Sequence, residues 1–143
     1  IGLLTATAMV AATGGEVSHY RDARHFASWF GLTPKEHSSG STRHLGRISK
    51  RGDRYLRMLL THGARAVLRA ASVARLASKQ VDGLKDWALQ VQGRTNHNKA
   101  ACALANKLAR ICYAVLKHHE PYGSQTRREE NKKINRTAYA VAI

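Results

Sequence analysis

The sequence predicts a mainly α-helical fold, a compact bundle of about five helices joined by a basic Ser/Gly-rich loop. Three observations lead to this fold class. Apolar residues recur three and four positions apart in several segments, which is the spacing of one buried helix face. Glycines, prolines and capping residues stand where these segments begin and end. No apolar/polar alternation longer than four residues indicates a strand. The 143 residues suffice for one domain with a modest core.

The first two helices are predicted in the N-terminal part of the chain. Leu3–Thr13 is rich in Ala and Leu, and the pair Gly14-Gly15 after it is a good C-terminal stop. Asp22 is the expected N-cap of the second helix, which Gly31 ends and Pro34 cannot extend. Its apolar face is aromatic and consists of Phe26, Trp29 and Phe30. Residues 34–51 then lose all periodicity and predict an exposed loop or a short hairpin.

The third predicted helix is the strongest, and it begins at Gly52 or Asp53. We expect Gly63 to permit a close helix contact on its buried stripe, formed by Leu56, Leu59, Leu60, Gly63, Val67 and Leu68. A weaker helix over residues 81–92 is expected to stop at Gly93 and to place Trp87 near its edge. Its inward residues are Leu84, Ala88 and Leu89.

The last clear helix is expected to be capped by Asn96 or Asn98. Its predicted core face is Leu104, Leu108, Ile111, Val115 and Leu116. After Pro121 the apolar pattern is lost until Ala138. We therefore expect a domain over residues 1–122 and a basic, disordered tail over residues 123–143.

The charge balance points to a polyanionic partner. The chain has 24 Lys and Arg against nine Asp and Glu, a formal net charge of +15. Such an excess is typical of proteins that bind nucleic acid. No apolar run is long enough to span a membrane, so a membrane partner is not expected. The two cysteines lie ten positions apart in one helical pattern, too far for a disulfide, and indicate a reduced, cytoplasmic protein.

The cations concentrate between residues 43 and 75, where nine Lys and Arg accompany a single acid, Asp53. An arginine guanidinium can give a phosphate two parallel hydrogen bonds. The predicted phosphate-binding residues are Arg43, Arg47, Lys50, Arg51, Arg54 and Arg57. The alternative is a solvated basic face without a ligand, but such a face normally mixes both signs of charge.

A serine-rich run, His37-Ser38-Ser39-Gly40-Ser41, lies beside these cations. One interpretation is a nucleophilic hydroxyl held on a loop, with arginines that neutralise the phosphate it attacks. The other is a plain flexible linker. The spacing of the histidines and acids does not indicate a metal site in this chain. Residues 1–6 could be the end of a helix-hairpin-helix element, or the start of a plain core helix.

Several motifs together resemble the C-terminal domain of the insertion-sequence transposases of the IS110/IS116/IS902 family. The resemblance covers residues 1–122 and is most specific over residues 31–57. It rests on the runs Gly2-Leu3-Leu4-Thr5-Ala6, Phe26-Ala27-Ser28-Trp29-Phe30-Gly31-Leu32-Thr33-Pro34, Ser39-Gly40, Gly46-Arg47-Ile48-Ser49-Lys50-Arg51-Gly52-Asp53, Leu56-Arg57, Ala105-Asn106-Lys107-Leu108-Ala109-Arg110 and Pro121-Tyr122.

This resemblance implies a recombinase whose serine becomes covalently linked to DNA. The family pattern Pro-x-x-x-x-Ser-Gly falls on Ser39, with Ser38 as the alternative and Ser41 as a further neighbour. It also implies a guide RNA, a dimer or tetramer, and work on DNA in the bacterial cytoplasm at the nucleoid. Divalent Mg is expected on a RuvC-like domain that is absent from this chain, so the chain alone is expected to be inactive. A non-catalytic DNA- or RNA-binding helical module remains the alternative function.

Overall fold

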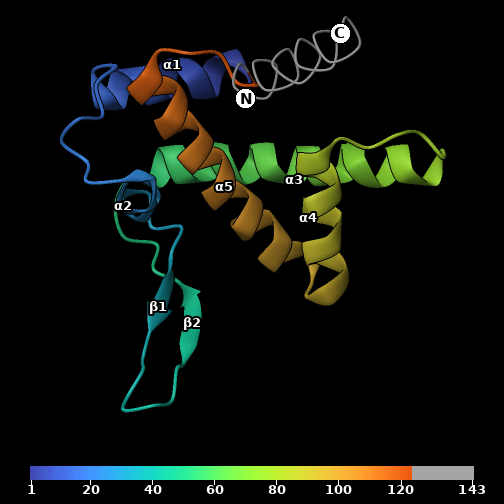
Figure 1. The fold of residues 1–143 in the computed structure, drawn as a ribbon, viewed down its shortest axis with the longest axis horizontal. Helices are drawn as coiled ribbons and strands as arrows, with labels where there is room; N and C mark the ends of the chain where they lie inside the picture. The colour runs from blue at the N-terminus through green and yellow to red at the C-terminus, as the bar shows by residue number, and fades with distance from the viewer. Residues whose placement is uncertain (124–143) are drawn as a thin grey trace, which may run out of the picture.

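The computed structural model describes residues 1–123. It is mainly α-helical, as predicted, with one small antiparallel sheet (Figure 1). In chain order the elements are α1 (Leu3–Thr13), α2 (Ala23–Trp29), β1 (Pro34–Glu36), β2 (Leu45–Ile48), α3 (Arg54–Leu76), α4 (Gly83–Arg94) and α5 (His97–His118). The predicted tail from residue 124 onward lies outside the described residues.

Side-chain caps set where four of these helices begin. The Asp22 carboxylate accepts a hydrogen bond from the His25 backbone N–H at 2.7 Å. Asp53 caps α3 in the same way, and Asn96 rather than Asn98 caps α5. Asp82, which the sequence analysis did not single out, caps α4. Each cap satisfies a helix N–H that has no partner within the helix and is worth about 1 kcal/mol.

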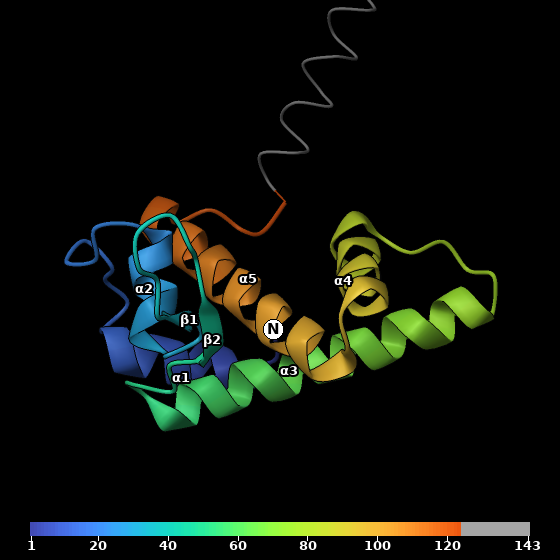
Figure 2. The same cartoon turned by 90° about the horizontal axis from the view of Figure 1, so that it is seen from below.

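The core forms where α5 crosses α3 (Figures 1 and 2). Helices α2 and α4 pack against opposite ends of α5, and α1 packs on α3. The largest fully buried side chains are Phe26, Phe30, Leu56, Leu60, Leu68, Leu104 and Val17. The predicted aromatic face of α2 is thus confirmed for its two phenylalanines, while Trp29 is half-buried at the edge of the core.

Around Phe26 the aromatic rings join α2 to the C-terminal half of α5. Its ring lies 4.9 Å from that of Phe30 and 5.7 Å from that of Tyr113, between centroids. The Tyr113 hydroxyl donates to the backbone carbonyl of Tyr20 at 3.3 Å. Tyr113 therefore ties α5 to the segment before α2 as well as to the core.

Three expectations about glycines and core positions are wrong. Gly63 is exposed, and an added Cβ would meet nothing within 4 Å, so no neighbouring helix comes close there. Gly93 does not end α4, which runs one residue further because the helix hydrogen bonds continue through it. Ile111, Val115 and Leu116 are only half-buried, because within residues 1–123 they border a pocket rather than a packed neighbour.

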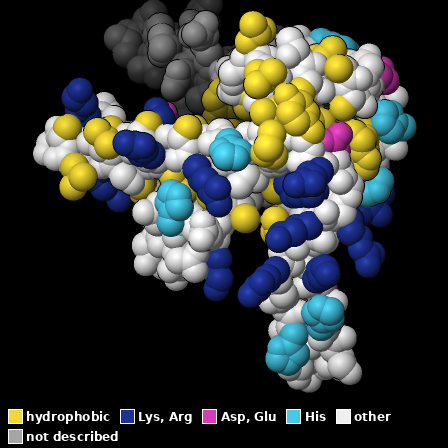
Figure 3. All heavy atoms as spheres, turned by 180° about the vertical axis from the view of Figure 1, so that it is seen from behind, with side chains coloured by type: hydrophobic (Ala, Val, Ile, Leu, Met, Phe, Trp, Pro, Cys, Tyr) yellow, Lys and Arg dark blue, Asp and Glu magenta, His cyan; other side chains and the backbone are white. Residues whose placement is uncertain are grey.

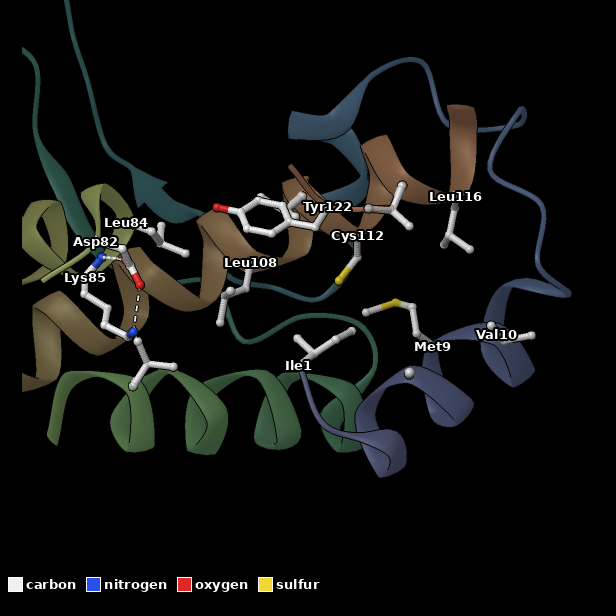
Figure 4. A pocket seen from close by; sticks show the side chains of 14 residues that line it. Ile1, Met9, Val10, Asp82, Leu84, Lys85, Leu108, Cys112, Leu116 and Tyr122 are labelled. Atoms are coloured by element: carbon white, nitrogen blue, oxygen red, sulfur yellow. Dashed lines mark hydrogen bonds and ion pairs between the residues drawn. The ribbon is translucent and has the colours of Figure 1, made fainter. Parts of the chain in front are cut away.

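These three side chains instead line an apolar pocket of about 420 Å³ between α1 and α5. In Figure 4, Ile1 and Met9 face Leu108 and Cys112 across it. The interpretation of α1 as a plain core helix holds on one side only: Met9 is buried in the core, while the opposite side of the helix is exposed. Leu3 is 81% exposed and Leu4 is 60% exposed. The helix-hairpin-helix interpretation stays a prediction.

The helices of the described part include none that is long and apolar enough to cross a membrane. Cys102 and Cys112 are free thiols, as the spacing predicts. Burial raises the pKa of the Cys112 thiol, so this group behaves as a small apolar side chain.

Two glycines fix the junction where the hairpin leaves the helices. Gly31 follows α2 at φ +67°, and Gly52 precedes α3 at φ +90°, both in the left-handed region. A Cβ on Gly31 would collide with the backbone of Arg51, and a Cβ on Gly52 would collide with the Trp29 carbonyl. The two chain segments therefore cross backbone against backbone, which only glycine permits.

This contact predicts opposite effects of the same substitution at two glycines. Gly52→Ala should lower the free energy of unfolding by about 3 kcal/mol or more, because it combines a positive φ with a backbone collision. Gly63→Ala, in the exposed interior of α3, should raise it by about 0.5–1 kcal/mol. Urea denaturation followed by circular dichroism measures both, and equal effects at the two sites would contradict the described junction.

Candidate nucleic-acid interface

The hairpin projects away from the helical body and carries the serines at its tip (Figure 1). Ser39 and Thr42 exchange two backbone hydrogen bonds of 3.1 Å across a turn formed by Gly40 and Ser41. Gly40 has φ +58°, and a positive φ at the first central position alone is the pattern of a type II′ hairpin turn. The predicted loop or hairpin is therefore a hairpin, and Ser39 is the last residue before its turn.

The Ser38 side chain is exposed, and its hydroxyl is hydrogen-bonded to both arms of the hairpin. It donates to the Glu36 carboxylate at 2.7 Å and accepts from the His44 backbone N–H at 3.3 Å. The same Glu36 oxygen also accepts from Arg43 Nε at 3.0 Å. The hydrogen bond from Ser38, followed by the positive charge of Arg43, lowers the pKa of Glu36, so the group is a carboxylate at neutral pH.

The structure thus separates the serines that the sequence could not distinguish. Ser38 belongs to a cluster with Glu36 and Arg43 that joins the two arms of the hairpin. Ser39 and Ser41 are exposed, and within residues 1–123 their hydroxyls make no hydrogen bond. A hydroxyl with both its proton and its lone pairs available can approach a bound phosphate, whereas that of Ser38 must first leave its partners.

The predicted phosphate-binding residues spread from the hairpin tip to the start of α3. Arg43 lies at the tip and is paired with Glu36, as described above. Arg47 lies on β2, Lys50 and Arg51 follow the strand, and Arg54 opens α3. Lys and Arg side chains gather along the hairpin and the adjoining face of the body, where Asp and Glu are sparse (Figure 3).

Arg57 differs from the other predicted cations because its guanidinium is half-buried and bonded to the fold. Its Nη1 donates to the Phe30 carbonyl at 2.9 Å and to the Asp53 carbonyl at 3.4 Å. These bonds fasten the first turn of α3 to the end of α2. Contact of Arg57 with phosphate stays a prediction, and the structure adds this anchoring role.

Two cations that the sequence analysis did not single out face the hairpin from α5. A groove of about 1290 Å³ separates the hairpin from the N-terminal half of α5. Arg47 and Lys50 line its hairpin side, and Lys99 and Arg110 line its helix side. The sequence alone could not predict that these two pairs of cations lie on opposite sides of one groove, because about fifty residues separate them along the chain.

The acidic residues near this surface make hydrogen bonds that hold the fold together. Asp22 and Asp53 cap helices, and Glu36 binds Ser38 and Arg43. Among residues 1–123, no group of three or more His, Cys, Asp or Glu side chains could hold a metal ion. The carboxylates of this surface therefore do not fit a divalent metal site.

Comparison with known proteins gives this basic hairpin a family context. The sequence profile of the transposase family IS116/IS110/IS902 matches residues 1–79, which include α1, α2, the hairpin and α3. The chain belongs to the IS116/IS110/IS902 transposase family. The resemblance proposed from the sequence motifs is therefore confirmed.

Individual members of the IS116/IS110/IS902 family match beyond this profile. A protein of Pseudomonas aeruginosa described as "Probable family 20 transposase" is 45% identical over 122 residues, 85% of this chain and 34% of its own length. The transposase for insertion sequence element IS1111A of Coxiella burnetii is 38% identical over 122 residues, 85% of this chain and 32% of its own. The transposase for insertion sequence element IS1328 of Yersinia enterocolitica is 39% identical over 115 residues, which are 80% of this chain and 32% of its own length.

The chain thus spans about a third of the length of these curated transposases. No solved structure matches it.

The contacts of Arg57 predict that two neighbouring arginines differ in their effect on stability. Arg57→Ala should lower the free energy of unfolding by about 1–3 kcal/mol, because the Phe30 carbonyl loses a charged donor. Arg54→Ala is the matched control, since this side chain is exposed and should change stability by less than about 0.5 kcal/mol. Chemical denaturation measures both, and equal losses would contradict the anchoring role.

Proposed function

We propose that this chain is the part of a DNA transposase that binds DNA along its basic hairpin and supplies Ser39 as the nucleophile for strand cleavage and rejoining. The observation that carries this proposal is the contrast between two hydroxyls at the hairpin tip. The Ser38 hydroxyl is bonded to Glu36, while the exposed Ser39 hydroxyl has no hydrogen-bond partner among the described residues. Membership in a transposase family supports the choice of DNA as the substrate.

The chemistry of cleavage follows from an exposed hydroxyl beside guanidinium groups. Oγ of Ser39 attacks the phosphorus of a DNA phosphodiester, a phosphoserine ester forms, and the bond from phosphorus to one strand oxygen breaks. The Ser39 proton leaves to a base, and the departing strand oxygen takes up a proton and becomes a hydroxyl. Attack of a strand hydroxyl on the phosphoserine reverses these steps and rejoins the DNA, so no external energy source is required.

The cations assist this reaction electrostatically. Arg47, Lys50 and Arg54, which lie between the hairpin tip and the body, can bind phosphates of a strand that runs along the hairpin from the attacked phosphate, and arginine forks suit this task. Glu36 is a poor base for Ser39, because its hydrogen bond with Ser38 lowers its pKa. We assign to Glu36 the role of fastening the hairpin tip.

The remaining components are proposed for the full-length transposase. We propose that a divalent magnesium ion bound by the acids of a RuvC-like domain supports the reaction, and that a structured RNA guides it within a homo-oligomer. Within residues 1–123 no group of acids or histidines fits the metal, so no step of the reaction described for Ser39 passes through it. Under this proposal the chain alone binds nucleic acid but does not recombine DNA.

A serine pair distinguishes catalysis from binding. In the full-length transposase, Ser39→Ala should abolish strand exchange and the covalent protein–DNA adduct seen on a denaturing gel, with DNA affinity unchanged. Ser38→Ala is the matched control and should retain the adduct, because its hydroxyl serves the hairpin. Normal recombination by Ser39→Ala would leave the alternative, a non-catalytic DNA- or RNA-binding module. An adduct lost only in Ser38→Ala would transfer the nucleophile to Ser38.

The basic surface predicts strongly salt-dependent binding. With about five phosphates neutralised, log K should fall with log salt concentration at a slope of roughly −4 to −5. Fluorescence anisotropy of labelled DNA at several salt concentrations gives this slope. A slope near zero would contradict binding through the cations of the hairpin.

A further inference from the structure

The groove between the hairpin and α5 has features that a simple basic surface does not have. Its hairpin side is formed by β2 and the residues after it, and its helix side by α5, with Trp87 of α4 contributing to the lining. Its volume of about 1290 Å³ is three times that of the apolar pocket beside α1. One hydrogen bond joins the two sides near the base of the hairpin, where Asn106 of α5 donates to the Leu32 carbonyl at 3.4 Å.

The charge of this groove is of one sign. Arg47 and Lys50 stand on one side and Lys99 and Arg110 on the other, and among the described residues that line it none is Asp or Glu. The N-terminus of α5, a helix of 22 residues, also opens into the groove through His97 and Asn98. Its unpaired backbone N–H groups and partial positive charge add to the attraction for an anion.

Arg110 provides an independent indication that the groove takes a ligand. Its Nε is buried, and within residues 1–123 it has no hydrogen-bond partner. Buried polar atoms of native proteins are nearly always hydrogen-bonded, so this guanidinium, which lines the groove, is left by the described fold with room for an acceptor from a ligand or a bound water.

The floor of the groove indicates the form of that partner. Besides the cations, most of the lining surface is apolar and includes Ile48, Trp87 and Ala103, with Asn98 and Asn106 among its polar members. A duplex presents its phosphates and conceals the faces of its bases, so it would leave this floor without a contact. An unpaired strand offers both groups, and grooves for single strands combine cations for the backbone with apolar surfaces for the bases.

We propose that this groove binds an unpaired DNA strand, with phosphates on Arg47, Lys50, Lys99 and Arg110 and bases on the apolar floor. The choice of DNA over RNA rests on the proposed function. An unpaired stretch of DNA would then lie along the hairpin whose tip carries Ser39. The sequence predicts only the basic surface of the hairpin, and the structure adds α5 as the opposite side of the groove.

The test compares a single strand with a duplex. Anisotropy of a labelled twelve-nucleotide deoxyribo-oligomer and of its duplex is measured with the chain and with Lys99→Glu. This substitution places an acid in the first turn of α5, where it favours the helix, so the variant is expected to fold. We expect roughly a tenfold or greater loss of single-strand affinity, a salt slope reduced by about one to two, and duplex affinity changed by less than about threefold.

Two variants control this experiment. Arg69→Ala removes an exposed cation of α3 that does not line the groove, and should change single-strand affinity by less than about twofold. Arg110→Gln tests the buried nitrogen and should weaken the single strand in the same selective way as Lys99→Glu, with the helical circular dichroism signal confirming the fold.

The other outcomes overturn the proposal. Equal losses for single strand and duplex, or an equal loss in Arg69→Ala, would show that the groove is only part of a general basic surface. Tighter binding of the ribo-oligomer of the same sequence would assign the groove to RNA. A chain with Ser39→Ala should bind the single strand normally, so failure of the serine chemistry and failure of the groove are separately visible.

Discussion

The close backbone contact at Gly31 and Gly52 fixes where the basic hairpin leaves the helical body, and the candidate nucleic-acid interface depends on it. There the end of α2 and the segment before α3 approach closely enough to exclude any Cβ. The Lys50 N–H donates to the Gly31 carbonyl at 3.0 Å, and the Ser49 N–H donates to the Thr33 carbonyl at 2.8 Å. The chain between these points has to leave the helical body and return to it, and the result is the projecting hairpin. Because Arg57 closes the same junction, the direction of the hairpin is fixed by the core rather than by its own short strands.

The distribution of charge follows from what the few acids do. Three aspartates of the described part, Asp22, Asp53 and Asp82, cap helices, and Glu36 joins the two arms of the hairpin. Glu36 neutralises Arg43 at the hairpin tip, whereas no Asp or Glu among the described residues lines the groove with Arg47, Lys50, Lys99 and Arg110. The groove between the hairpin and α5 therefore carries positive charge of one sign. The acids serve helix caps and the hairpin, and the cations of the groove are those proposed for nucleic-acid binding.

Helix α1 and the C-terminal half of α5 show the limit of periodicity as a guide to burial. The sequence of α1 is apolar on all sides, which is typical of a buried helix, yet it lies at the edge with Leu3 and Leu4 exposed. Ile111 and Leu116 keep the spacing of a core face but line the adjacent pocket. A periodic stripe shows which face of a helix is apolar. Whether another element covers that face depends on the packing of distant segments.

Local chemistry determined much of this protein from its sequence alone. The cap at Asp22, the stop at Gly14 and the two phenylalanines of the aromatic face of α2 depend on residues close together in the chain, so the sequence predicted them correctly, and it narrowed the caps of α3 and α5 to two candidates each. The tertiary structure decided what depends on distant residues: Ser38 bonded to Glu36 and His44 while Ser39 stays exposed, Arg57 on the Phe30 carbonyl, and α5 as the second wall of the groove. The sequence positions of Lys50 and Lys99 do not predict that both line one groove, because the packing of α5 against α3 brings these two segments together.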